Sequence, residues 1–520
     1  MSALLAMHGL RVEAGSRTLL GPLDLALHRG ECVGLVGESG SGKSLTALAL
    51  LGLLPPALRA QGTLATDGGE FAPGARAHAA LRGRLLAWVP QDPLASLHPL
   101  RTVGAQLVET LRVRHGLPRA AARREAAALL ARVQLPEPEA ALARHPHQFS
   151  GGQRQRIAIA LALATRAQVL IADEPTSALD ARIARDLLEL LDGLRREHGL
   201  GLLLISHDLP LVGAYAQRLL VLRRGEVVEA GATHAVFAAP AHAYTRELLA
   251  ADRLAPVPAP ERTDPAPVLL RGEGLRVRYP RARREALAGV DLALRRGEGL
   301  ALVGESGSGK STLGRTLLRL LRGAQGRVWL DGQELTALPA RALRRLRARI
   351  GVVFQDPVAS LDPRLRVAEL VAEPLRIHGL GDAAARRARA AALLQAVGLE
   401  PALLERYPHQ LSGGQCQRVA IARALATEPA LLLCDEAVSA LDAHHRAGVL
   451  ALLARLKRER GLALLFVTHD LAAAAAVAER IAVLEAGRIV EQGATAEVLA
   501  RPRHPHTRAL VAARALPAVR

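Results

Sequence analysis

Short runs of consecutive apolar residues alternate along this chain with long stretches rich in alanine, leucine and arginine. Two of the apolar runs, 169–172 and 431–434, lead directly into an Asp-Glu pair, and two later runs stop just before His207 and His469. A strand buried on both faces of a parallel sheet has this uninterrupted apolar character. Functional groups gather where such strands end. The runs therefore predict buried parallel strands with polar side chains at their carboxyl ends.

Further patterns complete the predicted elements. Apolar runs predict strands at 85–89 and 349–354, and the alanine- and arginine-rich stretches 105–132 and 368–397 are typical of helices. Near the start of each half, apolar and polar residues alternate in the manner of exposed antiparallel strands. We therefore predict an α/β fold with a mainly parallel sheet core, an antiparallel β subdomain and a helical subdomain.

The whole series of patterns occurs twice. Lys43 and Lys310 are 267 positions apart, Gln91 and Gln355 are 264 apart, and three further pairs share a spacing of 262. These pairs are Ser150 and Ser412, Asp173 and Asp435, and His207 and His469. A nearly constant offset over five landmarks indicates a duplicated domain. The segment between the copies carries five prolines and predicts a semi-rigid linker. We predict domains at 1–250 and 268–520, joined by a linker at 251–267.

Each half contains one copy of the pattern G-x-x-x-x-G-K-S, between a predicted strand and a predicted helix. Such a loop wraps nucleotide phosphates with backbone N–H groups, at the positive end of a helix dipole. Two copies with identical filling predict two nucleotide triphosphate sites. The candidate residues are Gly37, Glu38, Ser39, Gly40, Ser41, Gly42, Lys43, Ser44 and Leu45, and Gly304, Glu305, Ser306, Gly307, Ser308, Gly309, Lys310, Ser311 and Thr312.

Composition narrows the classes of protein. The chain has only three lysines, and two of them stand in these loops, where a compact ammonium suits the β- and γ-phosphates. Three unpaired cysteines suit a reducing compartment and argue against zinc or an iron–sulfur cluster. We expect no signal peptide and no membrane span, so a role at a membrane would need a channel from other chains.

The net charge of +19 has two interpretations. It could mark contact with RNA, DNA or lipid headgroups. It could equally reflect an arginine-rich composition on solvated helix faces, and runs such as 341–349, with Leu and Ala at helical spacing, favour that interpretation.

With these motifs in this order, the chain resembles the ATP-binding cassette (ABC) family over both halves. The resemblance implies tandem P-loop ATPase domains that pack head to tail, with ATP held between one half's phosphate loop and the other half's Ser-Gly-Gly-Gln. That motif comprises Ser150, Gly151, Gly152 and Gln153, and Ser412, Gly413, Gly414 and Gln415.

The resemblance also implies a role for each motif. Lys43 and Lys310 would neutralise phosphate charge, and Glu174 and Glu436 would act as general bases on water. His207 and His469 would contact the γ-phosphate, while Gln91 and Gln355 would sense it together with the metal. The implied Mg²⁺ ligands are Ser44, Gln91 and Asp173, and Ser311, Gln355 and Asp435.

Structural alternatives exist for several of these motifs. A Ser-Gly-Gly before a helix can be a simple helix cap, and an Asp-Glu after a strand can start a solvated loop. A histidine after a strand can be purely structural. The doubled spacing favours the functional interpretation in each case.

The two halves differ at two places. ABC proteins usually stack an aromatic residue on adenine, and Tyr279 fits that role, but the aligned residue in the first half is Ala14. The first site would then hold adenine more weakly, or would hold it through another residue. Ala437-Val438 replaces Pro175-Thr176 after the second acidic pair, yet the catalytic acid is kept, so both sites are expected to be complete.

Three additional motifs resemble the dipeptide, oligopeptide and nickel importer ATPases, in particular the fused microcin C-type and glutathione-type peptide importers. They are the Asp-Pro-x-x-Ser-Leu segments at 92–97 and 356–361, the Pro-His-Gln segments at 146–148 and 408–410, and the Pro/His/Thr elements at 240–245 and 502–507. The resemblance implies ATP and Mg²⁺ as cofactors, two transmembrane permeases and an extracytoplasmic binding protein as partners, and a peripheral location at the cytoplasmic face of the inner membrane.

A second class also fits the motifs, namely a soluble tandem ABC protein that acts on ribosomes or nucleic acid. Ribosome-acting relatives usually join their cassettes by a long charged helical arm, which the proline-rich linker does not resemble. DNA-repair relatives carry zinc cysteines or long coiled coils. The sequence therefore favours transport.

Overall fold

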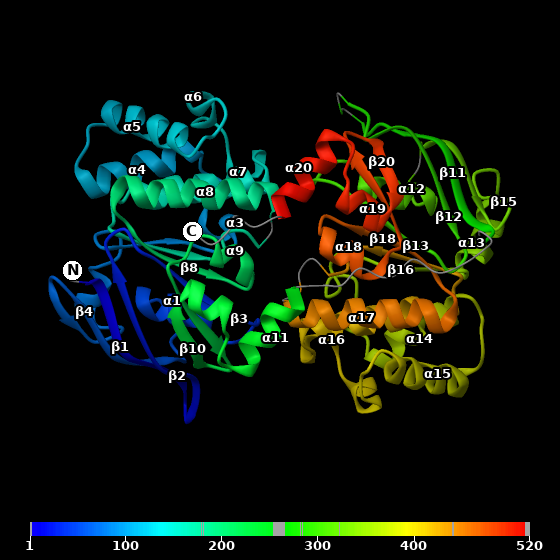
Figure 1. Cartoon of the computed structure of the whole chain (residues 1–520), viewed down its shortest axis with the longest axis horizontal. Coiled ribbons are helices and arrows are strands. Elements are labelled where there is room, and N and C mark those ends of the chain that lie inside the picture. The colour runs from blue at the N-terminus through cyan, green and yellow to red at the C-terminus, as the bar shows by residue number, and fades with distance from the viewer. Residues whose placement is uncertain are drawn as a thin grey trace. The chain divides into compact units, whose positions relative to one another are not determined.

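The computed structural model describes residues 3–177, 179, 181–252, 266–280, 282, 284–321, 323–438, 441 and 443–514. The described residues divide into two compact units, one ending at Ala250 and the other beginning at Ala251 (Figure 1). Most of the predicted linker, residues 253–265, lies outside the described residues.

The first unit is built on a six-stranded sheet with the order β10-β9-β3-β8-β7-β6. Every neighbouring pair is parallel except β9 and β10, so the predicted mainly parallel core is confirmed. The strands are β3 (Cys32–Gly37), β6 (Leu86–Val89), β7 (Val169–Asp173), β8 (Gly201–Ser206), β9 (Arg218–Arg223) and β10 (Glu226–Ala232). β3, β7 and β8 are buried at all their positions, as expected for strands covered on both faces.

The second unit repeats this sheet in the order β16-β17-β18-β13-β19-β20, again with one antiparallel edge strand. Its strands are β13 (Gly299–Val303), β16 (Ile350–Val353), β17 (Leu431–Asp435), β18 (Ala463–Thr468), β19 (Arg480–Glu485) and β20 (Arg488–Ala494). In both units the phosphate-loop strand therefore lies next to the strand that precedes the histidine.

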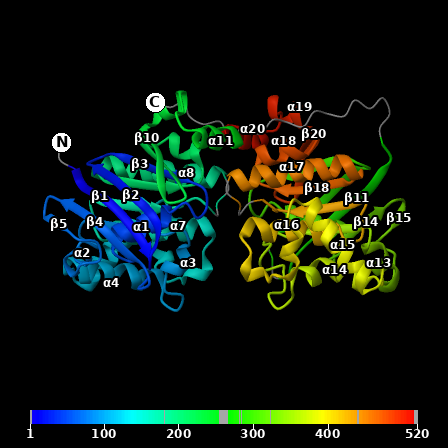
Figure 2. The ribbon, with the colours of Figure 1, turned by 90° about the horizontal axis from the view of Figure 1, so that it is seen from below.

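A separate antiparallel sheet completes the β structure of each unit, and Figure 2 shows β1, β2 and β4 side by side. The first sheet comprises β1 (Ala3–Ala14), β2 (Arg17–His28), β4 (Arg59–Thr66) and β5 (Gly69–Phe71), and the second β11 (Val268–Val277), β12 (Leu287–Arg295), β14 (Gln325–Leu330) and β15 (Gln333–Glu334). The antiparallel prediction is confirmed, but these strands are not simply exposed. Leu10 and Val12 are fully buried because their face covers the helix that follows the phosphate loop.

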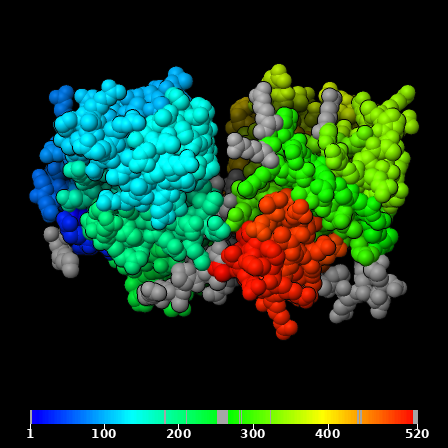
Figure 3. Space-filling view, turned by 90° about the horizontal axis from the view of Figure 1, so that it is seen from above, coloured from blue at the N-terminus to red at the C-terminus, as the bar shows by residue number. Residues whose placement is uncertain are grey.

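Each predicted helical stretch is two helices. The stretch 105–132 forms α4 (Val103–His115) and α5 (Arg119–Arg132), because Gly116 takes a left-handed turn and Pro118 precedes the next helix. The stretch 368–397 likewise forms α14 (Val367–Ile377) and α15 (Ala383–Ala396). In the first unit α4, α5 and α7 (Gly151–Leu163) pack together, and their part of the surface is the cyan region of Figure 3.

The remaining helices surround the sheets. In the first unit they are α1 (Lys43–Leu51), α2 (Arg76–Ala79), α3 (Pro93–Ser96), α6 (Pro138–Ala141), η1 (Pro146–Gln148), α8 (Ala181–His198), α9 (Leu209–Gly213), α10 (Thr233–Ala238) and α11 (Ala243–Asp252). In the second they are α12 (Lys310–Leu317), α13 (Ala340–Arg347), η2 (Pro401–Glu405), η3 (Pro408–Gln410), α16 (Gly413–Ala424), α17 (Ala443–Arg460), α18 (Leu471–Val477), α19 (Thr495–Ala500) and α20 (Pro505–Arg514). None of the helices in the described ranges has the length and apolar character to span a bilayer.

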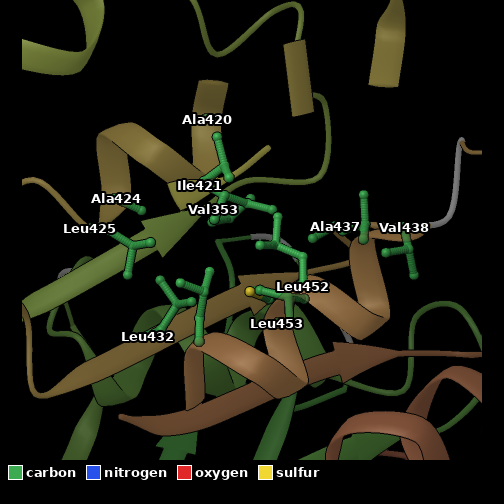
Figure 4. Packing of buried hydrophobic residues seen from close by; sticks show 14 of the residues in the cluster. Val353, Ala420, Ile421, Ala424, Leu425, Leu432, Ala437, Val438, Leu452 and Leu453 are labelled. Carbon is green, nitrogen blue, oxygen red and sulfur yellow. The ribbon is translucent and has the colours of Figure 1, made fainter. Parts of the chain in front are cut away.

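The exchange of Pro175-Thr176 for Ala437-Val438 has a packing role. Ala437 and Val438 are buried in the hydrophobic core of the second unit, near Leu452 and Leu453 of α17 (Figure 4). The two apolar side chains extend that core next to the acidic pair without removing either acid.

Candidate nucleotide-binding sites

The phosphate loop of each unit joins a buried strand to a helix at a point that only glycine fits. A Cβ at Gly37 would lie 2.2 Å from the carbonyl oxygen of Leu222, and one at Gly304 would lie 2.3 Å from that of Leu484. Gly42 and Gly309, just before the helices, both have φ near +108°, a backbone conformation that residues other than glycine rarely adopt. The glycines therefore let the loop backbone turn tightly and leave its N–H groups free of side-chain bulk.

The loop lysines are held by the loops themselves. Lys43 Nζ donates to the carbonyl oxygens of Gly37 and Glu38, both at 2.8 Å. Lys310 Nζ donates in the same way to Gly304 at 2.8 Å and Glu305 at 2.9 Å. Both side chains are only 4% exposed, so each ammonium is fixed inside its loop.

A hydroxyl and a carboxylate meet at the carboxyl end of β7 and again at β17. Ser44 Oγ lies 3.2 Å from Asp173 Oδ1, and Ser311 Oγ lies 2.8 Å from Asp435 Oδ1. Burial raises the pKa of both aspartates, although the serine hydrogen bonds oppose this. Hydroxyl and carboxylate oxygens at this spacing fit the ligand chemistry of Mg²⁺.

The second acid of each pair has an unusual backbone. Glu174 and Glu436 take φ values of 45° and 49°, in the left-handed region that is rare for residues other than glycine. Each is held there because its N–H donates at 2.9 Å to the neighbouring strand, at Ile205 and Val467 respectively. Backbone strain of this kind clusters at functional sites.

Three predicted residues converge on Glu174. Gln91 Nε2 lies 3.0 Å and His207 Nδ1 3.2 Å from Glu174 Oε2, and Lys43 Nζ lies 3.7 Å from Oε1. Burial opposes the ionisation of Glu174, but its hydrogen bond with His207 and the charges of His207 and Lys43 outweigh burial and lower its pKa.

The second unit repeats this group around Glu436. Gln355 Nε2 lies 2.8 Å from Glu436 Oε2, and His469 Nδ1 lies 3.8 Å from Oε1. The neighbouring His469 is the largest influence on Glu436 and lowers its pKa against the effect of burial. Both glutamates are thus ionised at neutral pH, as a general base must be.

The Ser-Gly-Gly-Gln motif of each unit does not take part in the hydrogen bonds that join the phosphate loop, the acidic pair and the histidine of that unit, as far as the described residues show. Ser150 and Ser412 cap α7 and α16, with their hydroxyls accepting from the N–H of Gln153 and Gln415. Neither serine nor glutamine, within the described part, hydrogen-bonds to the phosphate loop of its own unit. The two serines are therefore helix caps, as the structural alternative proposed. The cap hydrogen bonds do not fill the space in front of the two glycines that follow the serines. A Cβ at Gly413 would meet open space, and one at Gly151 a single atom 3.9 Å away.

The residue expected to stack on adenine differs between the two units, and so do its surroundings. Tyr279 is 41% exposed, and its hydroxyl lies 3.2 Å from Thr312 Oγ1, directly after the loop serine. In the first unit Leu45 replaces the threonine, and β1 and β2 close in a tight turn in which Ala14 pairs with Arg17. At these two positions the first unit therefore has neither an aromatic ring nor the hydroxyl that holds it.

We expect Tyr279→Ala to weaken ATP binding at the second site by about 10-fold, because stacking on an aromatic ring stabilises a base by roughly 1–3 kcal/mol. Titration in a Lys43→Ala background, where the first loop is disabled, isolates that site. Inorganic triphosphate has no base, so its affinity should not change. An equal loss for ATP and triphosphate would contradict the assignment of Tyr279 to adenine.

One contact of the phosphate loop was not predicted. The N–H of Glu38 donates at 2.9 Å to the hydroxyl of Tyr244, which comes from the Pro/His/Thr element at the end of the first half. The sequence marked that element only as a family resemblance. A separation of 206 residues leaves no local pattern from which the contact could be found.

Two phosphate loops, each with a lysine, a serine–aspartate pair and a glutamate at the end of a parallel strand, define a P-loop ATPase with two ATP sites. The model of the ABC transporter family matches residues 20–177 and 287–439, and the chain belongs to that family. The model named "Oligopeptide/dipeptide transporter, C-terminal region" matches residues 228–267 and 490–519.

Curated relatives align with nearly the whole chain. The glutathione import ATP-binding protein GsiA of Salmonella typhimurium is 43% identical over 94% of this chain and 85% of its own length. The peptidoglycan transport ATP-binding protein YejF of Agrobacterium fabrum is 44% identical over 93% of this chain and 90% of its own length. Both are ATP-binding proteins of transport systems, so the comparisons do not favour the ribosome-acting alternative.

Proposed function

We propose that this protein is the ATP-hydrolysing subunit of an importer for peptides or related small solutes. The observation that carries the proposal is the match of both C-terminal regions to the oligopeptide and dipeptide transporter family. The names of the relatives refer to glutathione import and peptidoglycan transport, which both concern solutes that contain short peptides.

Within each site we assign roles from the geometry. The lysine neutralises phosphate charge from inside the loop, and Ser44 with Asp173, or Ser311 with Asp435, would hold Mg²⁺ with help from Gln91 or Gln355. Bound Mg²⁺ would supply charge neutralisation on the phosphates. Glu174 and Glu436, ionised and kept in place by their glutamine neighbours, take the proton from the attacking water. His207 and His469 steady the glutamate and face the γ-phosphate position.

We further propose that the two ATP sites are composite, with the Ser-Gly-Gly turn of one half closing on the ATP bound by the other half. Helix N-termini at α7 and α16 provide backbone donors and a positive dipole for a phosphate. The open space in front of Gly151 and Gly413 supports this role, because a phosphate could approach the backbone there.

The partners in this proposal are two transmembrane permeases and, through them, an extracytoplasmic binding protein, with the chain peripheral at the cytoplasmic face of the inner membrane. ATP binding would close the halves and move the permeases between inward- and outward-facing states, and hydrolysis would reset them. Covalent fusion keeps the second cassette at a high effective concentration for the first.

Uptake and co-purification together test the proposal. We expect a strain without this chain to lose uptake of labelled short peptides, and the wild-type chain, but not Glu174→Gln/Glu436→Gln, to restore it. We also expect two multi-span membrane proteins to co-purify with the tagged chain in detergent. Co-purification with ribosomes or DNA, together with unchanged uptake, would overturn the proposal in favour of the soluble alternative.

A further inference from the structure

The helix that ends the first unit contacts the first phosphate loop through one side chain. Tyr244, near the start of α11, is 1% exposed, and its hydroxyl accepts the N–H of Glu38 at 2.9 Å. The carbonyl oxygen of Glu38 accepts a hydrogen bond from Lys43 Nζ. The peptide groups on both sides of Glu38 are therefore fixed, one by the phenol and one by the loop lysine.

Rigid neighbours hold Tyr244 in this position. The carboxylate of Glu229 on β10 accepts from the N–H groups of Ala241 and His242 at 2.8 and 3.1 Å, which anchors the start of α11 beside β10 (Figure 1). The Arg223 guanidinium, at the end of β9, lies 4.7 Å from the centre of the Tyr244 ring. β9 also pairs with the loop strand, Leu222 opposite Gly37, so the support and the loop share one sheet.

The second unit keeps this frame but changes the contact residues. The carboxylate of Glu491 accepts from the N–H groups of Arg503 and His504, as Glu229 does from its own partners. Glu485 and His506 lie 262 residues after Arg223 and Tyr244, and they occupy the corresponding positions in the second unit. His506 Nδ1 lies 3.3 Å from Glu485 Oε1, and within the described residues its buried Nε2 has no hydrogen-bond partner. An arginine–tyrosine pair has thus been replaced by a glutamate–histidine pair.

We propose that Tyr244 is a positioning residue for the first ATP site, and that the terminal Pro/His/Thr element acts in the first half as a support for the phosphate loop. A loop whose first peptide groups are already fixed loses less freedom when phosphate binds, and this favours binding. The support compensates in part for the missing aromatic at Ala14. The two ATP sites therefore obtain their affinity differently, the first from a preorganised loop and the second from the exposed ring of Tyr279.

Tyr244→Phe tests this inference, because it removes the hydroxyl and keeps the ring in the core. In a Lys310→Ala background, which leaves the first site to be measured alone, we expect Mg-ATP to bind about 3- to 10-fold more weakly, the value of one hydrogen bond. In a Lys43→Ala background, the same change should leave the second site unaffected. Hydrogen exchange of a peptide that covers residues 36–44 should become faster, because the Glu38 N–H loses its acceptor.

Tyr215→Phe is the matched control, since Tyr215 packs partly buried against the same core and comes from the segment after α9, not from the terminal element. The inference rests on nucleotide binding at these loops, and wild-type ATP binding in the same assay tests that point separately. Unchanged affinity and unchanged exchange in Tyr244→Phe would overturn the inference. So would an equal loss at both sites, or an equal loss in Tyr215→Phe, because either would reveal a general effect on stability.

Discussion

Replacing Glu174 and Glu436 together by glutamine will abolish steady-state ATP hydrolysis while ATP stays bound. Both carboxylates are ionised, and both are held by a glutamine amide within 3.0 Å. Glutamine has nearly the same shape but cannot accept the proton of the attacking water. A general base typically contributes about 100- to 10,000-fold to a rate, so we expect turnover to fall by at least ~100-fold. Phosphate release measures turnover, and equilibrium binding of labelled ATP measures retention.

Single variants and an unrelated acid serve as controls. Glu174→Gln alone and Glu436→Gln alone will each leave one intact base, which separates the contributions of the two sites. Glu109→Gln removes an exposed acid that forms a surface pair with Arg101, and this variant should hydrolyse ATP normally. Substantial hydrolysis by the double variant would refute the assignment of these glutamates as bases.

Lys43→Ala and Lys310→Ala will each strongly weaken ATP binding at their own site. Each ammonium is 4% exposed and donates to two loop carbonyls, so its loss removes both the phosphate charge partner and two charge-assisted hydrogen bonds. We expect affinity to fall by about 10- to 100-fold, because one charge-assisted hydrogen bond from the ammonium to a phosphate is worth roughly 1.5–3 kcal/mol. Arginine should not rescue the site, because a planar guanidinium does not fit between the two carbonyls. Nucleotide titration of each variant measures the loss.

The third lysine of the chain provides a matched control. Lys457 is also 4% exposed, but it pairs with Glu479 and donates to the carbonyl of Val477, away from either loop. Lys457→Met should lower the melting temperature, because the partly buried carboxylate of Glu479 loses its cationic partner, and should leave ATP affinity unchanged. Equal loss of ATP binding in all three lysine variants would mean that the loop lysines act through stability alone.

The sequence predicted the parts of the fold in which neighbouring residues carry the information. Apolar runs that end in polar residues marked β7, β8, β17 and β18, since strands buried on both faces need no alternation. The glycine-rich loops marked β3 and β13 and the helices after them. Because the domain is duplicated, each of these patterns occurs twice in the sequence. Equivalent contacts, such as Lys43 to Gly37 and Lys310 to Gly304, occur in both units.

Two features that depend on residues distant in the sequence were not predicted. The left-handed backbone of Glu174 depends on a hydrogen bond to the next strand, and the Tyr244 contact depends on how α11 lies against the loop. The alternation in β1 indicated antiparallel strands but could not tell which face a helix would cover. Gly116 and Gly379, which divide the helical stretches, were visible in the sequence as turn residues but were not used.

A structure of the Glu174→Gln/Glu436→Gln chain with ATP and Mg²⁺ tests the central claim most directly. We expect two ATP molecules. One would lie at Lys43 with its γ-phosphate also bound by Ser412 and the Gly413 N–H, and the other at Lys310 with its γ-phosphate also bound by Ser150 and the Gly151 N–H. A γ-phosphate that is contacted only by its own half, at either site, would contradict the account.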